Sequence, residues 1–371
     1  MPESLNDIQR QFLNSVEELC EEISQILISD MDSSDQTTQI RRLSIEAGIW
    51  SFHHPSDLGG RPQSSLVELV LLHESLASRN WTRLAGVIGP SPGLLANVEE
   101  PLRSKYLKPL LAGEKRAAFG FTEPDHAEKQ TYGTIEGEHL RVNGQKSYVT
   151  GGDTADFINT LVQIEDHGPS MVVIDRSAQG VNVQESFGSS DGSSHVYITF
   201  QDVCVPISHV VGKPGRGLPS AMGQITDTRM VLAAQSCGLA KWVVDFVASH
   251  IQAPHRSGSP LATREGVRLR FSDMRIKAFA MRSMVYRTAR LGDLGENVIN
   301  EVIASKVFAT EEIGKVVDSA IQLVGGNALQ TGHPLDDIQR LVRSWRLAEG
   351  ASDILRLNLA RGFLDLEKGR L

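Results

Sequence analysis

The chain has 371 residues, a formal net charge of −8 at pH 7 and 22% charged residues, values that are ordinary for a soluble globular protein. The negative charge, without any Lys/Arg-rich run, disfavours a nucleic acid or an anionic membrane surface as partner. An acidic N-terminus argues against a signal peptide, and no apolar run approaches the ~20 residues that span a bilayer. We therefore expect a cytoplasmic protein with two or three domains.

The three cysteines, Cys20, Cys204 and Cys237, lack the spacing of a metal or redox site. We interpret them as reduced core residues of a cytosolic protein. His53 and His54 are adjacent, but no third ligand follows at a useful spacing. We therefore expect no metal site.

The first part of the chain, residues 1–116, is predicted to form a helical domain. Asp7 is placed to cap a helix that runs to Ile28, and apolar residues recur along it at the spacing of one helical face. These residues are Ile8, Phe12, Val16, Leu19, Ile23 and Leu27. A second helix is expected to begin at Asp35 and to end at Gly48, and a third is expected over 64–77.

A different pattern begins at residue 117 and continues to residue 212. Short runs such as S-M-V-V-I-D and V-Y-I-T-F are separated by Gly, Asn, Asp and Pro. Regularly spaced short strands without helices between them predict an antiparallel β-barrel or sandwich. The following loop, G-K-P-G-R-G-L-P, lacks the spacing and the Lys-Ser/Thr pair of a phosphate-binding loop, so we interpret it as a linker.

Residues 213–371 predict a C-terminal four-helix bundle. Long helical runs are expected over 220–251, 262–291 and 297–323, with two shorter ones after them. Heptad-like apolar positions and short connections favour this arrangement. The expected fold class is an α+β multidomain protein with an N-terminal helical domain, a middle β domain and the C-terminal bundle.

The segment R-S-W-R-L-A-E-G-A-S-D-I-L-R places Glu349 at a helix–glycine–helix junction. A helix over 335–347 stops at this junction, and Ser352 or Asp353 is placed to cap the next one. Such a carboxylate projects either into solvent, at an ordinary turn, or into an apolar cleft. In a cleft its pKa would be raised, which suits a general base that works near neutral pH.

The stretch E-G-A-S-D-I-L-R, which begins at Glu349, resembles E-G-T-S-Q-I-Q-R of the acyl-CoA dehydrogenases, in which the Glu removes the α-proton of an acyl thioester. The order of helical, β and helical-bundle segments also matches that family along essentially the whole chain. The resemblance implies α,β-dehydrogenation of an acyl group carried by CoA or by an acyl carrier protein. Because no amino-acid side chain accepts the β-hydride, FAD is the implied cofactor and its N5 the hydride acceptor.

The resemblance has further implications for partners and for charge stabilisation. An electron-transfer flavoprotein is the implied electron acceptor, and a homodimer or homotetramer is the implied assembly. In the family, the flavin ribityl hydroxyl and the backbone N–H of the catalytic Glu stabilise the developing enolate. By analogy the second donor here would be the N–H of Glu349.

Two stretches of the β region resemble the family's contacts with the flavin ring. F-G-F-T-E-P resembles a strand and loop whose backbone and Thr hydroxyl touch the ring, which implies roles for Phe121 and Thr122. N-G-Q-K-S-Y-V-T resembles N-G-x-K-x-W-I-T, so Tyr148 would cover the ring and Thr150 would contact its N5 edge. Taken alone, the N-G pair also fits a hairpin turn, and Tyr148 fits an aromatic residue of a barrel.

A third match lies in the C-terminal region. I-Q-L-V-G-G-N-A resembles Q-x-x-G-G-x-G, in which the Gln and the paired glycines approach the FAD of a neighbouring subunit. The resemblance implies such cofactor contacts for Gln322, Gly325 and Gly326. A plain helix C-cap also explains the glycines.

Further residues of this region are assigned to the substrate site. Arg229, in I-T-D-T-R, matches an Arg near the thioester–pantetheine channel, although an ordinary helix-surface Arg would also fit. Thr228 occupies the position of the base in some subfamilies but cannot act as one, which leaves Glu349. Gly350, the second residue of the E-G pair, is grouped with them.

The chain departs from the family pattern around the phosphate contacts. After T-E-P it reads D-H-A-E-K in place of G-A-G-S-D, and these carboxylates would repel a pyrophosphate unless Lys129 or His126 compensates. The family's R-x-x-F-G-x-P-L is represented by P-H-R-S-G-S-P-L, so Arg256 matches the FAD-phosphate Arg only in part. Two alternatives stay open: a flavin oxidase or hydroxylase of the same fold, and a non-catalytic homologue that has lost FAD binding.

Overall fold

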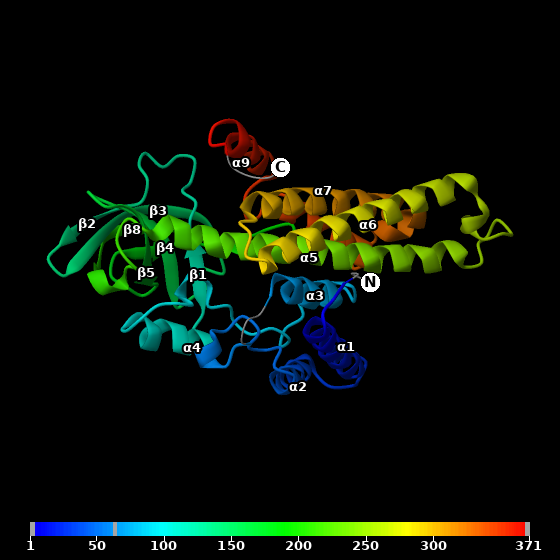
Figure 1. The fold of residues 1–371 in the computed structure, drawn as a ribbon, viewed down its shortest axis with the longest axis horizontal. Coiled ribbons are helices and arrows are strands. Elements are labelled where there is room, and N and C mark those ends of the chain that lie inside the picture. Colours follow the sequence, from blue (N-terminus) through cyan, green and yellow to red (C-terminus); the bar gives the residue numbers. More distant parts are fainter. Residues whose placement is uncertain (1–3, 62–64, 368–371) are drawn as a thin grey trace. The chain divides into compact units, whose positions relative to one another are not determined.

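The computed structural model describes residues 4–61 and 65–367 (Figure 1). The contacts within it divide the chain into two compact units, the helical unit and the β unit. The helical unit consists of the described parts of Met1–Ile49, Gln63–Val87 and Thr226–Leu371, and the β unit of those of Trp50–Pro62 and Ile88–Ile225. The division into three domains stays a prediction.

The first two helices of the helical unit begin at side-chain caps. α1 (Asp7–Leu27) is capped by Asn6, which forms a reciprocal capping box with Gln9, so the expected cap at Asp7 was placed one residue late. α2 (Ser33–Glu46) is capped by Asp32 rather than by a residue near Asp35. Of the predicted apolar face of α1, Phe12, Val16, Leu19 and Ile23 are buried, whereas Ile8 in the first turn is exposed.

α3 (Leu66–Ala77) begins at a second capping box, formed by Ser65 and Glu68. The expected start at Ser64 lies outside the described residues. Every residue of α3 from Val67 onward is buried. This helix therefore lies in the interior of the helical unit.

The C-terminal part of the chain forms a set of helices, which are α5 (Gly217–Gln252), α6 (Glu265–Asp293), α7 (Ile299–Val324), α8 (Pro334–Trp345) and α9 (Ser352–Leu364). α6 packs against α7, and α7 packs against α8 (Figure 1). The predicted helical bundle is confirmed, with ends that differ by a few residues. The predicted linker extends too far, because α5 already begins at Gly217, and α9 begins without the predicted side-chain cap.

One stretch of α5 is long and apolar enough to cross a membrane by length and composition, in contrast to the expectation from the sequence. Of that stretch, 61% is buried inside the protein. Such burial is typical of the core helix of a globular protein.

A buried polar network joins α3 to α6. Glu74 accepts hydrogen bonds from Arg282 and from the Tyr286 hydroxyl, so both of its carboxylate oxygens are paired. Burial and the charge of Glu74 raise the pKa of Tyr286, which keeps the phenol a neutral donor. Because removal of one partner would leave a buried charge uncompensated, this network stabilises the packing of α3 on α6.

Gly238 lies where α5 closely approaches α3. A Cβ at this position would lie 2.3 Å from the Glu74 carbonyl oxygen and 2.6 Å from the Ala77 Cβ. We expect Gly238→Ala to lower the free energy of unfolding by about 1–3 kcal/mol, because the packed helices must separate. Gly314→Ala in α7 meets nothing within 4 Å and should raise it by about 0.5–1 kcal/mol. Denaturant unfolding measures both, and effects of the same sign would contradict this interpretation.

The β unit contains a curled eight-stranded sheet. Its strands are β1 (Ala117–Gly120), β2 (Tyr132–Glu136), β3 (His139–Thr150), β4 (Phe157–Ile164), β5 (Gly168–Asp175), β6 (Val181–Val183), β7 (Phe187–Gly188) and β8 (Ser194–Pro206). The order is β1-β4-β2-β3-β8-β6, with β5 paired to β4 and β7 paired to β8. A short helix, α4 (Lys108–Leu111), precedes the sheet in the chain.

The sheet differs from the predicted antiparallel one in two pairings. β4 runs parallel to β1 and to β2, whereas the other pairs are antiparallel. These parallel contacts join strands that are not consecutive in the chain, so the strand pattern in the sequence could not show them. One face of the sheet buries a cluster of apolar side chains that includes Val142, Ile158, Val172 and Ile198.

Asn143-Gly144 is not the hairpin turn that this dipeptide suggests on its own. Both residues lie inside β3, where the pairing with β8 shifts register between Val142 and Gly144. Gly144 has φ +139°, and a Cβ there would lie 2.6 Å from the Thr131 Cα. The glycine therefore serves a β-bulge that alters the course of the strand toward Thr150.

The three cysteines are free. Cys20 and Cys237 are buried, and burial raises the pKa of Cys20 to about 12 and that of Cys237 well above its ordinary value. Cys204, on β8, is exposed, so the expectation that all three cysteines are core residues is wrong for this one.

Candidate functional site

Glu349 lies in the short connection between α8 and α9, in an uncommon backbone conformation. Its φ is +55° and that of Gly350 is +101°, so two consecutive residues have positive φ. A Cβ at position 350 would lie 3.0 Å from Leu355 and 3.3 Å from the Arg229 guanidinium. Gly350 is therefore required both by its φ and by the space around it.

Two buried cations hold this connection through its backbone carbonyl groups. Arg229 is 4% exposed, and its Nε donates to the Glu349 carbonyl oxygen at 2.9 Å. Lys306 is 0% exposed, and its Nζ donates to the Gly350 carbonyl oxygen at 2.8 Å. We call these two hydrogen bonds the junction clamp. They fix the positive-φ backbone that determines where the Glu349 side chain starts.

The charges at the clamp act on one another. Burial raises the pKa of Glu349, whereas the nearby Arg229 and Lys306 lower it, and the net shift is upward. Burial and the charge of Arg229 lower the pKa of Lys306 to about 8, although Glu349 opposes this shift. Glu349 is half-buried, so its carboxylate is both shielded from water and accessible. A carboxylate with a raised pKa in such a place suits a general base.

The structure thus decides between the alternatives for two predicted residues. Glu349 is not an ordinary surface Glu at a turn, and Arg229 is not a helix-surface Arg. Thr228, one residue earlier in α5, is half-buried. All four predicted substrate-site residues belong to the helical unit.

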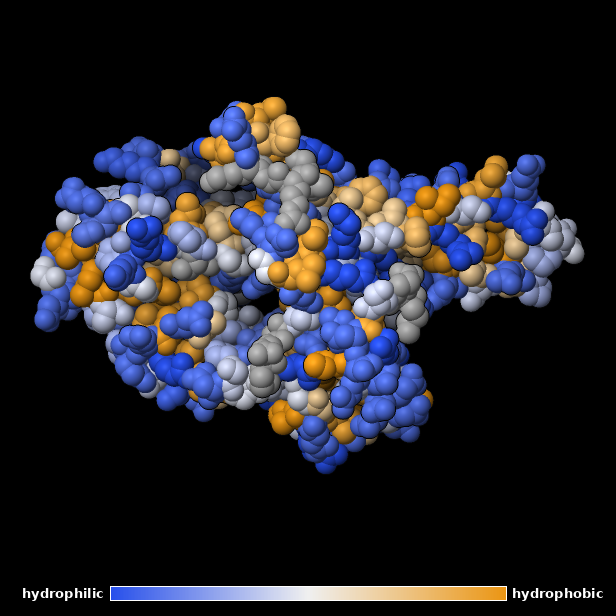
Figure 2. All heavy atoms as spheres, viewed as in Figure 1, coloured by the Kyte–Doolittle hydropathy of each residue, from blue (hydrophilic) through white to orange (hydrophobic). Residues whose placement is uncertain are grey.

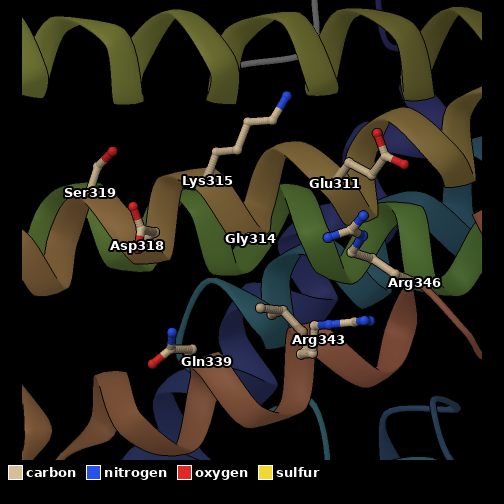
Figure 3. A pocket seen from close by; sticks show the side chains of 9 residues that line it. Glu311, Gly314, Lys315, Asp318, Ser319, Gln339, Arg343 and Arg346 are labelled. Atoms are coloured by element: carbon tan, nitrogen blue, oxygen red, sulfur yellow. The ribbon is translucent and has the colours of Figure 1, made fainter.

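A charged groove lies between α7 and α8 (Figure 3). One of the residues that line it, Arg346, is the C-cap of α8, shortly before Glu349 in the chain. It is lined by Glu311, Gly314, Lys315, Asp318, Ser319, Gln339, Val342, Arg343 and Arg346. Glu311 pairs with Arg356 of α9 at 2.7 Å, and the Ser352 N–H donates to the Arg346 carbonyl oxygen at 3.0 Å. Residues of this groove therefore hold the first turns of α9, which follow Glu349 in the chain.

A second group of predicted residues lies on one face of the β unit. Tyr148, on β3, has φ +52° and is 62% exposed, so its ring is not an interior residue of a barrel. Thr150 and Thr122 are exposed and Phe121 is half-buried. The Ser147 N–H donates to the Thr122 carbonyl oxygen at 2.8 Å, which holds the T-E-P loop beside β3.

Other aromatic rings surround Tyr148. Its ring centroid lies 5.8 Å from that of Phe187 and 6.0 Å from that of Tyr197. His195, on β8, lies 6.2 Å from Tyr148, and its Nδ1 is 3.1 Å from the Thr150 hydroxyl oxygen. We call Tyr148, Phe187, Tyr197 and His195 the aromatic platform. One exposed ring and three half-buried rings beside a hydroxyl group suit a planar heteroaromatic ligand whose edge carries hydrogen-bonding atoms.

The acid of the T-E-P segment, which precedes the loop that departs from the family pattern, is paired with a lysine. Glu123, within T-E-P, pairs with the Nζ of Lys146 and accepts from the Thr131 N–H at 3.2 Å. Burial lowers the pKa of Lys146, and Glu123 opposes that shift. Asp125, by contrast, is exposed on the loop. The predicted conflict with a pyrophosphate concerns the carboxylates of residues 125–129, and Asp125 is not paired as Glu123 is.

The remaining predicted cofactor residues lie elsewhere in the helical unit. Gln322 is exposed in the last turn of α7, and Gly325 is the C-cap of that helix with φ +82°. The C-cap interpretation is thus correct for Gly325, and Gly326 begins the short 3-10 turn that follows. Arg256 is exposed in the connection between α5 and α6. Within the described residues, no group of three or more His, Cys, Asp or Glu side chains could hold a metal ion.

The sequence analysis missed Lys306 and His195. Lys306 lies in I-A-S-K-V-F-A, where a lone Lys interrupts an apolar helical stretch. This interruption was the available signal, and the structure shows that the Lys is buried in α7. His195 lies in S-S-H-V-Y-I-T-F, a run in which side chains alternate between the two faces of a strand. This alternation does not indicate which residues His195 contacts. Its contact with Thr150 depends on the pairing of β3 with β8.

Comparisons with known proteins show the family to which the chain belongs. The family models of the acyl-CoA dehydrogenase middle domain and C-terminal domain match residues 118–203 and 215–364, respectively. The chain therefore belongs to the acyl-CoA dehydrogenase family, whose members are FAD-dependent oxidoreductases that dehydrogenate or reduce acyl-CoA. The predicted family, fold class and cofactor are confirmed.

Individual relatives and solved structures align with most of this chain. A short-chain-specific acyl-CoA dehydrogenase of Clostridium acetobutylicum is 29% identical over 70% of this chain and 71% of that protein. The CarC subunit of a caffeyl-CoA reductase–Etf complex of Acetobacterium woodii is 24% identical over 90% of this chain and 92% of its own. A solved acyl-CoA dehydrogenase of Bacillus anthracis complexed with FAD has a TM-score of 0.81 at 23% identity, over 99% of this chain and 68% of that one.

The residues of the β unit fit the flavin ring of FAD well, but the loop at residues 125–129 fits its phosphates less well. The aromatic platform, with the Thr150 hydroxyl beside His195, suits the flavin ring. The acidic loop at residues 125–129 is the less favourable part, because exposed carboxylates face any phosphate that approaches it.

Proposed function

We propose that this protein catalyses the α,β-dehydrogenation of an acyl thioester, with Glu349 as the base that removes the α-proton. The observation that carries this proposal is the half-buried Glu349, whose pKa is raised by burial while the junction clamp holds its backbone. A weakly acidic α-hydrogen requires a base that is desolvated yet ionised near neutral pH.

The site residues of the helical unit each have a role in this proposal. Glu349 takes the proton at its carboxylate oxygen, and its backbone N–H donates to the thioester oxygen as enolate charge develops. Arg229 and Lys306 keep that N–H and the side chain in place through the junction clamp. Thr228 and Gly350 line the approach of the thioester.

The β unit provides the flavin-ring contacts in this proposal. FAD supplies the acceptor for the β-hydrogen when it is bound. Tyr148 covers the ring, Thr150 meets its N5 edge, and the loop of Phe121 and Thr122 contacts it through backbone and hydroxyl groups. We also propose that Gln322, Gly325 and Gly326, with Arg256, contact the FAD of a neighbouring subunit.

The partners follow from the same reasoning. The acyl group is carried by CoA or by an acyl carrier protein, and an electron-transfer flavoprotein is the proposed acceptor, as the name of the CarC relative supports. A soluble cytoplasmic homodimer or homotetramer is the proposed state. Exposed apolar residues on α9, which include Ile354, Leu357, Phe363 and Leu364, support self-association, and apolar atoms gather over α9 in Figure 2.

The test is the visible absorption spectrum of the purified protein before and after incubation with FAD and desalting. We expect retained flavin bands that an acyl-CoA or an acyl carrier protein thioester bleaches in the absence of oxygen. Loss of all flavin on desalting would instead support a non-catalytic homologue, which the acidic loop at residues 125–129 favours. Rapid reoxidation of the reduced protein by oxygen would indicate an oxidase or hydroxylase.

A further inference from the structure

A chain of hydrogen bonds on the β unit leads from a carboxylate to the Thr150 hydroxyl. The Asp191 Oδ1 accepts from the Ser193 Oγ at 2.6 Å and from the Ser193 N–H at 3.0 Å. The Ser193 Oγ lies 3.0 Å from the His195 Nε2, and the His195 Nδ1 lies 3.1 Å from the Thr150 Oγ1. Asp191, Ser193 and His195 are half-buried, whereas Thr150 is exposed at the end of the chain of bonds.

The chemistry of the groups fixes the direction of each bond. An ionised carboxylate only accepts, so Ser193 uses its one hydroxyl hydrogen on Asp191. The Ser193 oxygen must then accept from His195, which places a hydrogen on Nε2. In neutral His195, Nδ1 is consequently an acceptor, and the Thr150 hydroxyl donates its hydrogen inward to it. The Thr150 oxygen then presents only lone pairs to whatever lies outside.

Protonation of His195 reverses the last bond. With a hydrogen on Nδ1, His195 donates to the Thr150 oxygen, and the Thr150 hydroxyl hydrogen becomes free to point outward. Thr150 is thus an outward acceptor beside neutral His195 and an outward donor beside protonated His195.

We propose that His195 is a positioning residue whose protonation state determines whether Thr150 donates to or accepts from the N5 edge of the bound flavin. The proposal rests on the proposed placement of the flavin ring against the aromatic platform. An oxidised flavin has an unprotonated N5, which accepts a hydrogen bond, whereas the reduced ring carries N5–H, which donates one. Protonated His195 therefore matches the oxidised ring, and neutral His195 matches the reduced ring.

This match links reduction to the loss of a proton from the protein. Two-electron reduction that forms the anionic reduced ring takes up one proton, which becomes the hydrogen on N5. The Nδ1 proton of His195 is released to solvent at the half-exposed imidazole as Thr150 turns from donor to acceptor. Where reduction releases this proton from His195, the proton gained at N5 is balanced by the proton lost from the imidazole, and reduction takes up no net proton.

The groups that face His195 fit a ring that exists in both states. The Ser193 hydroxyl connects the Asp191 carboxylate to the imidazole, and the Ser194 hydroxyl, one residue from His195, donates to the Asp153 carboxylate at 3.5 Å. Tyr148 of β3 and Phe187 of β7 flank the ring at 6.2 and 5.7 Å between centroids. The flanking rings limit the movement of the imidazole, while the carboxylates compensate its charge.

The experiment measures the two-electron midpoint potential of bound FAD against pH, between about pH 5 and pH 9, where a histidine titrates. The wild-type protein should show an interval in which the potential does not change with pH. His195→Asn keeps a polar group near the Nδ1 position but cannot titrate, and it should take up one proton for two electrons throughout that interval. Protonation elsewhere on the flavin affects both proteins equally, so the difference between them is the readout.

Two further variants make the test specific. Thr150→Val should abolish the interval, because the hydroxyl that transmits the protonation state is gone, and Ser193→Ala should shift it by freeing Nε2. His139→Asn, on the exposed start of β3, is the matched control and should behave as the wild type.

Identical pH dependence in the wild type and His195→Asn would overturn the role of His195. If both proteins are still bleached by an acyl thioester, the proposed function survives that outcome. A protein that does not retain FAD at all would refute both proposals together.

Discussion

Glu349→Gln is expected to reduce thioester-dependent bleaching of the flavin by at least about a thousandfold. The amide keeps the size of the side chain and leaves the junction clamp intact, because the clamp uses backbone carbonyl groups. It cannot accept the α-proton, however. Rapid-mixing measurements of flavin absorbance, with the FAD content of each protein determined beforehand, give the rate directly.

The matched control for this variant is Asp353→Asn. Asp353 is an exposed carboxylate in the first turn of α9, four positions after Glu349, and its side chain is 97% exposed. We expect its rate to stay within about twofold of the wild type, since exposed charges contribute little. Bleaching by Glu349→Gln at the wild-type rate would show that another group removes the proton.

Lys306→Met is expected to lower the bleaching rate by about ten- to a hundredfold, although Lys306 does not touch the substrate in our proposal. The variant removes the donor to the Gly350 carbonyl and leaves that carbonyl without its charged partner. The positive-φ connection that carries Glu349 then loses one of its two fixed points. Lys306→Arg, which keeps a charged donor, should recover part of the rate.

A loss of packing alone would not change the pH profile, so the profile identifies the electrostatic role of Lys306. Its charge lowers the pKa of Glu349, and removal of that charge should raise it. Because the base works only when ionised, the rate rises with pH through this pKa. The rising limb should therefore move to higher pH in Lys306→Met, and an unchanged limb would argue against the effect.

The same lysine makes a signed prediction for stability. Its folded-state pKa is about 8, below the ordinary 10.5. Between these two values the unfolded chain binds the proton and the folded protein does not, so the free energy of unfolding rises with pH. Measured as wild type minus Lys306→Met in denaturant unfolding, this contribution should increase from about pH 8 to 10.5 and be flat below that interval.

Much of the fold could be predicted because its signals are local. Apolar residues at helical spacing located α1, and short β-type runs located the strands of the β unit. Helix caps were harder, since Asn6 and Asp32 compete with acceptable caps one or three residues away. The parallel pairing of β4 with β1 and β2 depends on contacts between distant segments, which no local pattern encodes.

In the candidate site, too, local sequence signals indicated some residues, whereas contacts between distant segments could not be predicted. Glu349 was proposed because a Glu-Gly pair between two predicted helices marks a junction, and because its neighbours resemble a known segment. Lys306 acts through a carbonyl group 44 residues later in the chain, and His195 contacts Thr150 across 45 residues. Such partners become visible only when the helices are packed and the strands are in register.

The cysteines give this chain a practical property. Cys20 and Cys237 are enclosed and held as neutral thiols, whereas Cys204 is open to solvent on β8. A maleimide dye added to the folded protein at neutral pH should therefore attach at one place, because thiol reagents need an accessible sulfur that can ionise. Fluorescence from that dye would report on the β unit alone, without any engineered residue.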